Sequence, residues 1–411
     1  MKRIIKPSML FAWMLALASW LTIGAGCLAM GQSITIKVVK PSDSDKKTEE
    51  VKEDVKPAFS GKRPAVDVAI LLDTSNSMDG LISQAKTQLW KMVQKFAEAR
   101  QSGKTPILRV SVFEYGNTNL PASEGYIRQV VPLTDDLDKV SEALFALTTN
   151  GGDEYCGMVI AECLKRLDWS GEPNAYKAIF IAGNEPFTQG ETNYEEACRT
   201  AIDQGVVVNT IHCGNYDTGV SGKWKHGAEI AEGEYLNIDQ DKKVVTIKCP
   251  QDGIIIELNE QLNETYLWFG ATNERRLYEQ NQAKQDSNAG MAGGLSVRIA
   301  AKAGAAYRNV GRDLVDSYAE DPNSLAKIPA EQLPASMRDM NPQQRVEYVR
   351  EMSKRRSEIR QRIAKVSKER AEYLNDQLAN VPGASDEATF GDAFSQTVEK
   401  QLIESGFKVE P

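Results

Sequence analysis

The fold is decided by one stretch of the sequence, Val66-Asp67-Val68-Ala69-Ile70-Leu71-Leu72-Asp73-Thr74-Ser75-Asn76-Ser77-Met78. Residues 66–72 form a nearly continuous apolar run, which is typical of a parallel strand buried on both faces of its sheet. Apolar residues then recur at spacings of three and four, as on one face of a helix, at Leu81, Ala85, Leu89, Met92 and Phe96. We therefore predict a buried strand, a polar loop and an amphipathic helix in succession.

Working outward from this stretch, strand-like and helical segments alternate. Strands are predicted at residues 108–113, 127–131, 178–181, 206–211, 235–238 and 244–247. Helices are predicted at residues 135–147, 156–167, 194–204 and 253–269, the last of which would close the domain. Strands that alternate with helices indicate an α/β fold with an open, mainly parallel, doubly wound sheet.

The chain of 411 residues is long enough for about two folded units. From about residue 271 the strand signals stop, so we expect an α/β domain over residues 63–270 and an all-helical region over residues 271–411. Within residues 341–378, apolar residues recur every seven positions at Met352, Ile359, Val366 and Tyr373. This spacing predicts a long, partly coiled-coil-like helix, which either mediates self-association or packs on the rest of the chain.

The N-terminus has the pattern of an export signal. Its first residues are cationic, with Lys2, Arg3 and Lys6, and a largely apolar run follows over residues 9–26. We predict a signal peptide at residues 1–29, with a retained membrane anchor as the alternative, because the run is close to the length that spans a bilayer. Residues 30–62 are rich in charged residues, Ser and Pro, and we interpret them as a flexible linker.

Residues 23–27 also resemble a bacterial lipobox, in which Cys27 would be lipidated. Gly24 departs from the Leu that is usual at that place, and plain cleavage after Ala29 or Gly31 is the alternative. In either case we expect an exported protein that is periplasmic, membrane-anchored or extracellular. Attachment to a membrane would come from the lipid or from an uncleaved signal.

Charge and composition exclude several classes of function. The formal net charge is -8, whereas a general nucleic-acid binder needs clustered cations, so we expect no nucleic-acid partner. The two histidines, His212 and His226, are too few for a zinc site built from several histidines. The six cysteines form no Cys-x-x-Cys pair and leave the redox state open. There is no nucleophile elbow, P-loop or dinucleotide fingerprint.

The polar loop after the first strand is suited to a metal ion. In open α/β sheets, ligands bind at the carboxyl ends of the strands, where Asp73, Ser75 and Ser77 lie. Their oxygen atoms are the hard ligands that Mg²⁺ prefers. Because the serine hydroxyls carry no charge, a cation held by them can also accept a carboxylate from outside the chain.

Over residues 64–270 the chain resembles the von Willebrand factor type A (integrin I-like) domain family. The resemblance rests on residues 68–78, which match the family's pattern of an apolar strand followed by Asp-x-Ser-x-Ser. It implies a metal-ion-dependent adhesion site, in which Mg²⁺, or alternatively Mn²⁺ or Ca²⁺, links the domain to an Asp or Glu of a partner protein.

Two other loops depart from the family's pattern. In Thr149-Asn150-Gly151-Gly152-Asp153-Glu154, Asp153 stands where the family commonly has Thr, and in Ile181-Ala182-Gly183-Asn184-Glu185-Pro186, Asn184 stands where it has Asp. The resemblance implies that the metal ligands are Asp73, Ser75, Ser77, Asp153 and Asn184. Around these ligands we expect Thr149, Glu154 and Glu185. The alternatives are loops that bind no metal, and Asp153 acting as a helix N-cap.

These features predict an exported, metal-ion-dependent protein-binding module for adhesion or assembly, and not an enzyme. One alternative is a structural protein of the cell envelope whose metal site is inactive. A weaker alternative is a metal-assisted hydrolase, because Mg²⁺ and carboxylates can activate water. No positioned base or nucleophile can be named for such a reaction.

Overall fold

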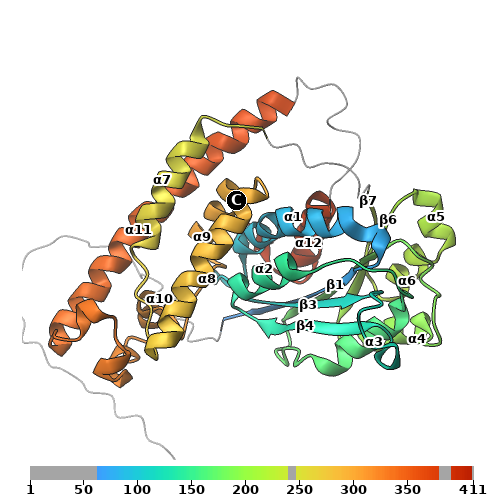
Figure 1. Ribbon diagram of the computed structural model, residues 1–411, viewed down its shortest axis with the longest axis horizontal. Helices are drawn as coiled ribbons and strands as arrows, with labels where there is room; N and C mark the ends of the chain where they lie inside the picture. Colours follow the sequence, from blue (N-terminus) through green and yellow to red (C-terminus); the bar gives the residue numbers. More distant parts are fainter. Residues whose placement is uncertain (1–62, 239–246, 379–389, 410–411) are drawn as a thin grey trace, which may run out of the picture. The chain divides into compact units, whose positions relative to one another are not determined.

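The computed structural model describes residues 63–238, 247–378 and 390–409 (Figure 1). Their main sheet has six strands in the order β4-β3-β1-β5-β6-β7. These strands are β1 (Ala65–Asp73), β3 (Ile107–Tyr115), β4 (Ile127–Thr134), β5 (Tyr176–Gly183), β6 (Val207–Cys213) and β7 (Tyr235–Ile238). All pairs are parallel except β3 with β4, so the predicted mainly parallel α/β sheet is confirmed.

Some of our predictions fall outside the described residues. The signal peptide, the lipobox with Cys27 and the linker all lie within residues 1–62, and most of the strand predicted at 244–247 lies within residues 239–246. Across the described residues, no helix combines the length and the apolar character needed to cross a bilayer.

Helices cover both faces of the sheet, as Figure 1 shows. Successive residues of β1 point to opposite faces, so Val68 and Ile70 belong to one hydrophobic cluster, and Ala69 and Leu71 to another. The first cluster includes side chains of α1 (Asp79–Ala97), α2 (Leu137–Ala146) and α12 (Phe390–Glu404). The second includes side chains of α3 (Cys156–Arg166), α4 (Tyr194–Asp203) and α6 (Trp224–Ile230). This two-sided burial explains why β1 has an almost uninterrupted apolar sequence.

The region after β7 is helical, as predicted. Before α12 its α-helices are α7 (Gln251–Asn263), α8 (Thr272–Met291), α9 (Leu295–Ala303), α10 (Leu314–Glu320) and α11 (Pro342–Leu378). The remaining elements are α5 (Tyr216–Ser221), β2 (Ala99–Arg100), β8 (Lys408–Val409) and the 3₁₀ helices η1 (Asn76–Met78), η2 (Ala122–Glu124), η3 (Leu325–Lys327), η4 (Ala330–Gln332) and η5 (Ala335–Met337).

The helix predicted at residues 253–269 as the one that closes the domain is α7, which ends at Asn263. It packs against α9 and α11, while α12 packs on α1 and β7. On α12, Phe394 packs on Phe180 of β5 with ring centroids 4.1 Å apart, and Gln401 accepts hydrogen bonds from Tyr176 and Asn209. Strand β8 then pairs with β2. Residues 60–411 form one compact unit, so the hydrophobic core continues across residue 270.

Two of the four heptad residues of α11, Met352 and Ile359, are buried, whereas Val366 and Tyr373 are half-buried. Ile363, which lies between heptad positions, is also buried, and α11 packs along α7, α9 and α10. The first half of the apolar stripe is therefore covered by helices of the same chain.

Buried ion pairs hold the helical region together. The guanidinium of Arg298 donates to Asp138 at 2.8 Å and to Asp286 at 2.6 Å, and the Lys302 ammonium donates to Asp286 at 3.0 Å. Arg356 donates to Asp313 at 2.7 Å. Both arginines and Lys302 are fully or almost fully buried, and each is matched by carboxylates of its own chain.

Candidate metal site at the carboxyl edge of the sheet

The loop after β1 gathers oxygen atoms at the edge of the sheet. The Asp73 carboxylate accepts a hydrogen bond at 2.7 Å from the backbone N–H of Ser75 through Oδ1. The hydroxyls of Ser75 and Ser77 lie 3.1 Å apart. Asp73 and Ser75 are buried, whereas Ser77 is exposed, so the cluster opens to solvent at Ser77.

The loop after β5 reaches the same cluster through Asn184. Its Nδ2 donates to the Ser77 hydroxyl at 3.2 Å. The neighbouring Glu185 is exposed, and its backbone carbonyl accepts a hydrogen bond from the indole of Trp224. Because β1 and β5 are adjacent parallel strands, their carboxyl ends meet, which brings Asn184 to Ser77.

The loop before α3 brings a different carboxylate to the cluster from the one we predicted as a ligand. Asp153 is exposed, and its Oδ2 accepts a hydrogen bond from the Tyr155 hydroxyl at 3.2 Å. Glu154 is buried, and its carboxylate is hydrogen-bonded by Ser75. Thr149 donates to Asp79 at the start of α1. Thus the structure brings Asp73, Ser75, Ser77, Asn184 and Glu154 together, while Asp153 and Thr149 point to other partners.

Glycines make room for the two carboxylates. Gly116, directly after β3, has φ +77°, and a Cβ there would lie 2.9 Å from Oδ1 of Asp73 and 2.7 Å from Cγ of Glu154. Gly183, at the end of β5, would place a Cβ 3.1 Å from Oδ2 of Asp73. Sequence reasoning missed these positions, although a glycine directly after a strand is a signal for close backbone approach.

The two buried carboxylates of the cluster both have raised pKa values. Burial raises the pKa of Asp73 to about 7, and the Glu185 carboxylate adds to the rise, while hydrogen bonds from Ser75 oppose it. Burial also raises the pKa of Glu154 to about 8, with further contributions from Asp73 and Glu185. Among the described residues no cation lowers either pKa, whereas Lys302 and Arg298 lower the pKa of Asp286 in the helical region.

The residues present fit a divalent cation. Oδ2 of Asp73 is buried and has no hydrogen-bond partner among the described residues, and leaving such an oxygen unpaired costs free energy. Within the described part of the chain, no three Asp, Glu, His or Cys side chains are grouped so that they alone could hold a metal. A cation at Asp73 therefore also needs the hydroxyls of Ser75 and Ser77 and the amide oxygen of Asn184.

Two other polar residues near the cluster, Cys156 and His212, are buried inside the protein. Cys156 is fully buried and donates weakly to the Tyr115 hydroxyl at 3.8 Å, and burial raises the pKa of its thiol well above the ordinary value. His212 is buried at the end of β6, and burial lowers its pKa. Cys156, Cys163, Cys198, Cys213 and Cys249 are all buried free thiols.

A mainly parallel α/β sheet, with oxygen-rich loops at the carboxyl ends of its strands, defines a class of ligand-binding domain. Residues 67–221 match the family model of the von Willebrand factor type A domain. The predicted resemblance to this family is therefore confirmed for residues 67–221. Domains of this family commonly act as metal-dependent protein-interaction modules, and most are adhesion or assembly modules without enzymatic activity.

Solved structures also resemble the chain. The VWA domain of SpRpn10 is 15% identical, with 44% of this chain and 90% of that chain covered and a TM-score of 0.34. The conserved hypothetical protein BatB from Bacteroides thetaiotaomicron is 14% identical over 54% of this chain and all of that one, with a TM-score of 0.33. PTMP1 from the mussel byssus, solved with a zinc-occupied MIDAS motif, is 15% identical over 44% of this chain and 43% of that one, with a TM-score of 0.33. No curated protein matches the chain.

Proposed function

We propose that the protein is an exported binding module that uses Mg²⁺ to engage an Asp or Glu carboxylate of a partner protein. One observation carries the proposal, namely that Oδ2 of Asp73 is buried without a partner among the described residues. It belongs to a cluster of oxygen ligands that ends at the exposed Ser77. A cation at Asp73 would remove the unpaired charge and would remain accessible from solvent.

The chemistry of the ligands favours Mg²⁺ or Mn²⁺. Carboxylate, hydroxyl and amide oxygens are hard ligands, and Mg²⁺ usually keeps several water molecules because few protein groups surround it. A carboxylate oxygen of a partner can replace one of these waters. Ca²⁺ prefers more oxygen ligands at longer distances, and we expect it to bind more weakly.

Export is part of the proposal on the strength of the N-terminal sequence. The basic residues before the apolar run at 9–26 are the pattern of a secretory signal. Lipidation at Cys27 would attach the protein to a membrane, and plain cleavage would release it. Mass spectrometry of the mature N-terminus distinguishes the two.

Calorimetric titration of the full chain with Mg²⁺ and Mn²⁺ tests the metal site. We expect saturable binding that Asp73→Asn and Ser75→Ala abolish or weaken at least about tenfold, which is about 1.4 kcal/mol. Two neighbouring carboxylates provide a matched pair. Glu154→Gln should change the affinity, whereas Asp153→Asn should leave it unchanged, because only Glu154 faces Asp73. Equal effects of the two substitutions would contradict our assignment.

Partner binding is tested separately from metal binding. The immobilised protein should retain a partner from a cell-envelope extract in Mg²⁺ and release it when a chelator is added. Asp73→Asn should retain none of that partner. If the same partner is retained by the variant and in chelator, the metal does not mediate recognition, and a structural role in the envelope is favoured instead.

A further inference from the structure

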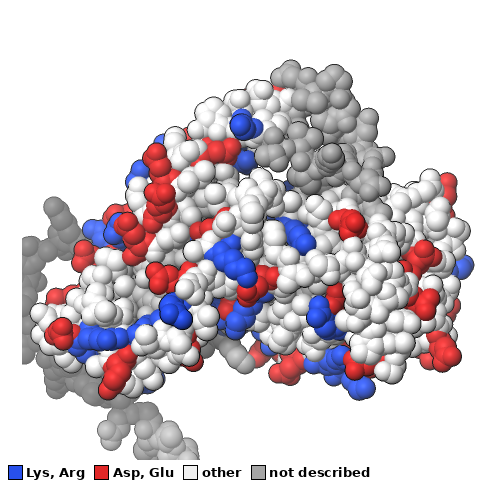
Figure 2. Space-filling view, in the orientation of Figure 1, with Lys and Arg blue, Asp and Glu red and all other residues white. Residues whose placement is uncertain are grey.

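The candidate metal site lies at an edge of the sheet whose loops are acidic. Among the described residues, the loops at the carboxyl ends of the strands are 74–79, 116–126, 148–155, 184–193 and 214–222, and we call them the edge loops. None of them contains a Lys or Arg, although these residues make up 49 of the 411 in the chain. Figure 2 shows Asp and Glu side chains at this end of the domain, on the right of the view. The acidic residues of the edge loops after Asp73 are Asp79, Glu124, Asp153, Glu154, Glu185, Glu191 and Asp217.

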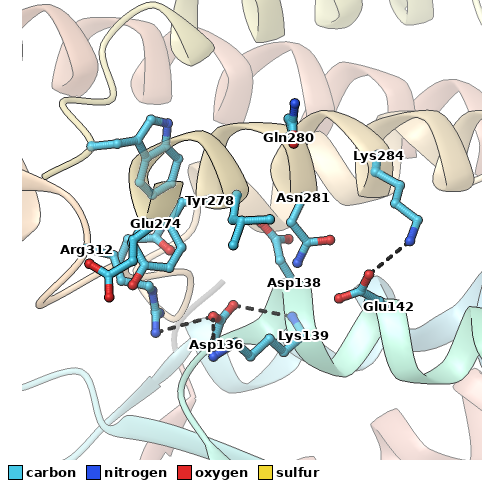
Figure 3. Close-up of a pocket in the computed structure, with 13 residues that line it drawn as sticks. Asp136, Asp138, Lys139, Glu142, Glu274, Tyr278, Gln280, Asn281, Lys284 and Arg312 are labelled. Atoms are coloured by element: carbon cyan, nitrogen blue, oxygen red, sulfur yellow. Dashed lines mark hydrogen bonds and ion pairs between the residues drawn. The ribbon is translucent and has the colours of Figure 1, made fainter. Parts of the chain in front are cut away.

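The cavity between α2 and α8 shows how acidic side chains are treated elsewhere in the molecule. In its wall, Asp136 pairs with Arg312 at 3.4 Å and with Lys139 at 3.7 Å (Figure 3). Across the cavity, Glu142 of α2 pairs with Lys284 of α8 at 2.9 Å. Acidic and basic residues of the same chain are therefore placed together there, whereas the edge loops have acidic residues alone.

Cations begin directly outside the edge loops but do not pair with them. Arg128 of β4 pairs with Glu114 of β3, and Lys223 follows the last edge loop. Lys86 of α1 donates to the carbonyl oxygen of Leu147 at 3.1 Å. Within the described part of the chain, none of the seven acidic residues listed above forms an ion pair. Their charge is therefore left for a partner to neutralise.

The acidic residues around the candidate metal site exceed the charge of one divalent cation. Beyond the effect of burial, the Glu185 carboxylate raises the pKa of both Asp73 and Glu154, and Asp153 adds to the rise at Glu154. These four carboxylates are thus within electrostatic reach of one another. When ionised, Asp73 and Glu154 already match the two charges of Mg²⁺, and the exposed Glu185 and Asp153 leave the site negative. A carboxylate that arrives alone is repelled by this excess charge.

Helix α5 offers a second kind of contact for a cation beside the site. Tyr216 is 51% exposed, and the exposed Asp217 is next to it. The face of a tyrosine ring attracts a cation, and a neighbouring carboxylate adds to the attraction. The helix is joined to the metal site through His212, since a Cβ at Gly219 would lie 2.6 Å from its Cγ and the backbone of Asn184 hydrogen-bonds its ring.

We propose that the partner presents its carboxylate in a protein segment flanked by Lys or Arg residues. Mg²⁺ would hold the carboxylate, and the acidic residues of the edge loops, with the ring of Tyr216, would hold the flanking cations. The cations would offset the excess negative charge that otherwise opposes binding. This inference rests on the proposed function, because it names the chemistry of the partner at the same site.

Nuclear magnetic resonance titration of the full chain with three short peptides in saturating Mg²⁺ tests the proposal. The peptides are Gly-Lys-Glu-Lys-Gly, Gly-Gln-Glu-Gln-Gly and Gly-Lys-Gln-Lys-Gly, with both ends capped so that only side chains carry charge. We expect the first peptide to bind at least about tenfold more tightly than either of the others, because only it supplies both the carboxylate and the cations. Chelator should remove its advantage over the third peptide, and added salt should reduce its advantage over the second.

Substitutions of exposed residues localise the contacts with the flanking cations. The double variant Asp153→Asn with Glu185→Gln should reduce the preference for the first peptide over the second by about threefold or more, and Tyr216→Ala should reduce it in the same direction. Asp203→Asn is the matched control and should leave the preference unchanged. Asp203 is also an exposed acidic residue, but it ends α4 just before the amino end of β6, at the opposite edge of the sheet. Circular dichroism checks folding, and calorimetry checks that each variant still binds Mg²⁺.

The possible failures separate this inference from the proposed function. If the first two peptides bind equally and both need Mg²⁺, the flanking cations are unimportant and metal-dependent recognition stands. If the first and third bind equally with and without chelator, the edge attracts cations without the metal, and both proposals are wrong. An equal effect of Asp203→Asn and the double variant would place the basic contacts elsewhere. Absence of binding of the first peptide to a chain that binds Mg²⁺ would also overturn the inference.

Discussion

The loops of the candidate metal site, after β1, after β5 and before α3 (the metal loops), bury carboxylates, and so does the helical region, but only the helical region pairs them with cations of the chain. In the helical region, Asp286 lies against Arg298 and Lys302 of the same chain. In the metal loops, Asp73 and Glu154 face each other with no such partner, and one oxygen of Asp73 has no hydrogen bond among the described residues.

The pKa values of Asp286 and Asp73 are shifted in opposite directions. Burial alone would raise the pKa of Asp286, but Lys302 and Arg298 outweigh it, and the pKa lies well below its ordinary value. Burial raises the pKa of Asp73 to about 7 because no cation of the chain opposes it. A carboxylate that is buried with its own cation holds the fold together. One that is buried without a cation is suited to binding a cation from outside.

Removal of an internal cation should have the largest effect. Arg298→Leu leaves Asp138 and Asp286 without their shared guanidinium, and we expect a loss of about 3–5 kcal/mol in the free energy of unfolding. Urea denaturation measures it. Arg199→Leu is the control, because the Arg199–Glu195 pair is exposed, and it should change stability by about 0.5 kcal/mol or less. Similar losses in both variants would show that the buried ion pairs matter no more to stability than an exposed one.

Addition of an external cation should have the next largest effect. Mg²⁺ at about 100 times its dissociation constant should stabilise the protein by about 2.7 kcal/mol, because it binds the folded state. Asp73→Asn should abolish this gain. In chelator the variant should be at least as stable as the unsubstituted protein, since it loses a buried carboxylate with an unpaired oxygen. Thermal denaturation with and without Mg²⁺ measures both effects, and a variant still stabilised by Mg²⁺ would contradict them.

Acid should weaken the helical region through Asp286. Because its pKa is lower in the folded state, its contribution is fully present above the unfolded value of about 3.9 and is lost as the pH falls through the folded value. We expect Asp286→Asn to cost about 2 kcal/mol at neutral pH, with the difference from the unsubstituted protein shrinking at strongly acidic pH. Urea denaturation across this range provides the test, and a constant difference would show that the carboxylate charge is unimportant.

Crowding at the metal loops should have the smallest effect on stability. Gly116 and Gly103 have nearly the same positive φ, but only Gly116 lies against Asp73 and Glu154, and a Cβ at Gly103 would meet nothing within 4 Å. Gly103→Ala should cost about 1 kcal/mol from backbone strain, and Gly116→Ala about 1 kcal/mol more. Only Gly116→Ala should lower the affinity for Mg²⁺. Equal affinities in the two variants would mean that the carboxylates adjust freely.

The parts of the molecule that could be predicted from the sequence are those with local signals. The apolar run of β1, the helical spacing of α1 and the alternation of strand-like and helical segments after them were sufficient to predict the sheet, because burial on both faces has a direct pattern. The Asp-x-Ser-x-Ser loop is also local, so Asp73, Ser75 and Ser77 could be grouped before the structure was known. The assignment of these residues as metal ligands is still a prediction.

The parts that could not be predicted depend on orientation and on distant contacts. Asp153 and Glu154 are neighbours in sequence, and only the path of the loop decides that Glu154 faces Asp73. Helix α7 ends at Asn263, before the predicted residue 269, because the chain beyond it hydrogen-bonds across to another segment, with the N–H of Leu267 donating to Asp313. No local pattern in residues 253–269 indicates that partner.

The position of α12 has a consequence for how the domain forms. Gln401 bonds to Asn209 across 192 residues of sequence, and the Phe394 ring fills the space over Phe180. Contacts between segments so distant in sequence form late and slow the folding reaction. Helix α12 can therefore pack on the sheet only after the intervening helices have been synthesised. A fragment cut at residue 270 would lack α12 and leave the apolar surface around Phe180 uncovered, so measurements on the candidate metal site need a chain that retains α12.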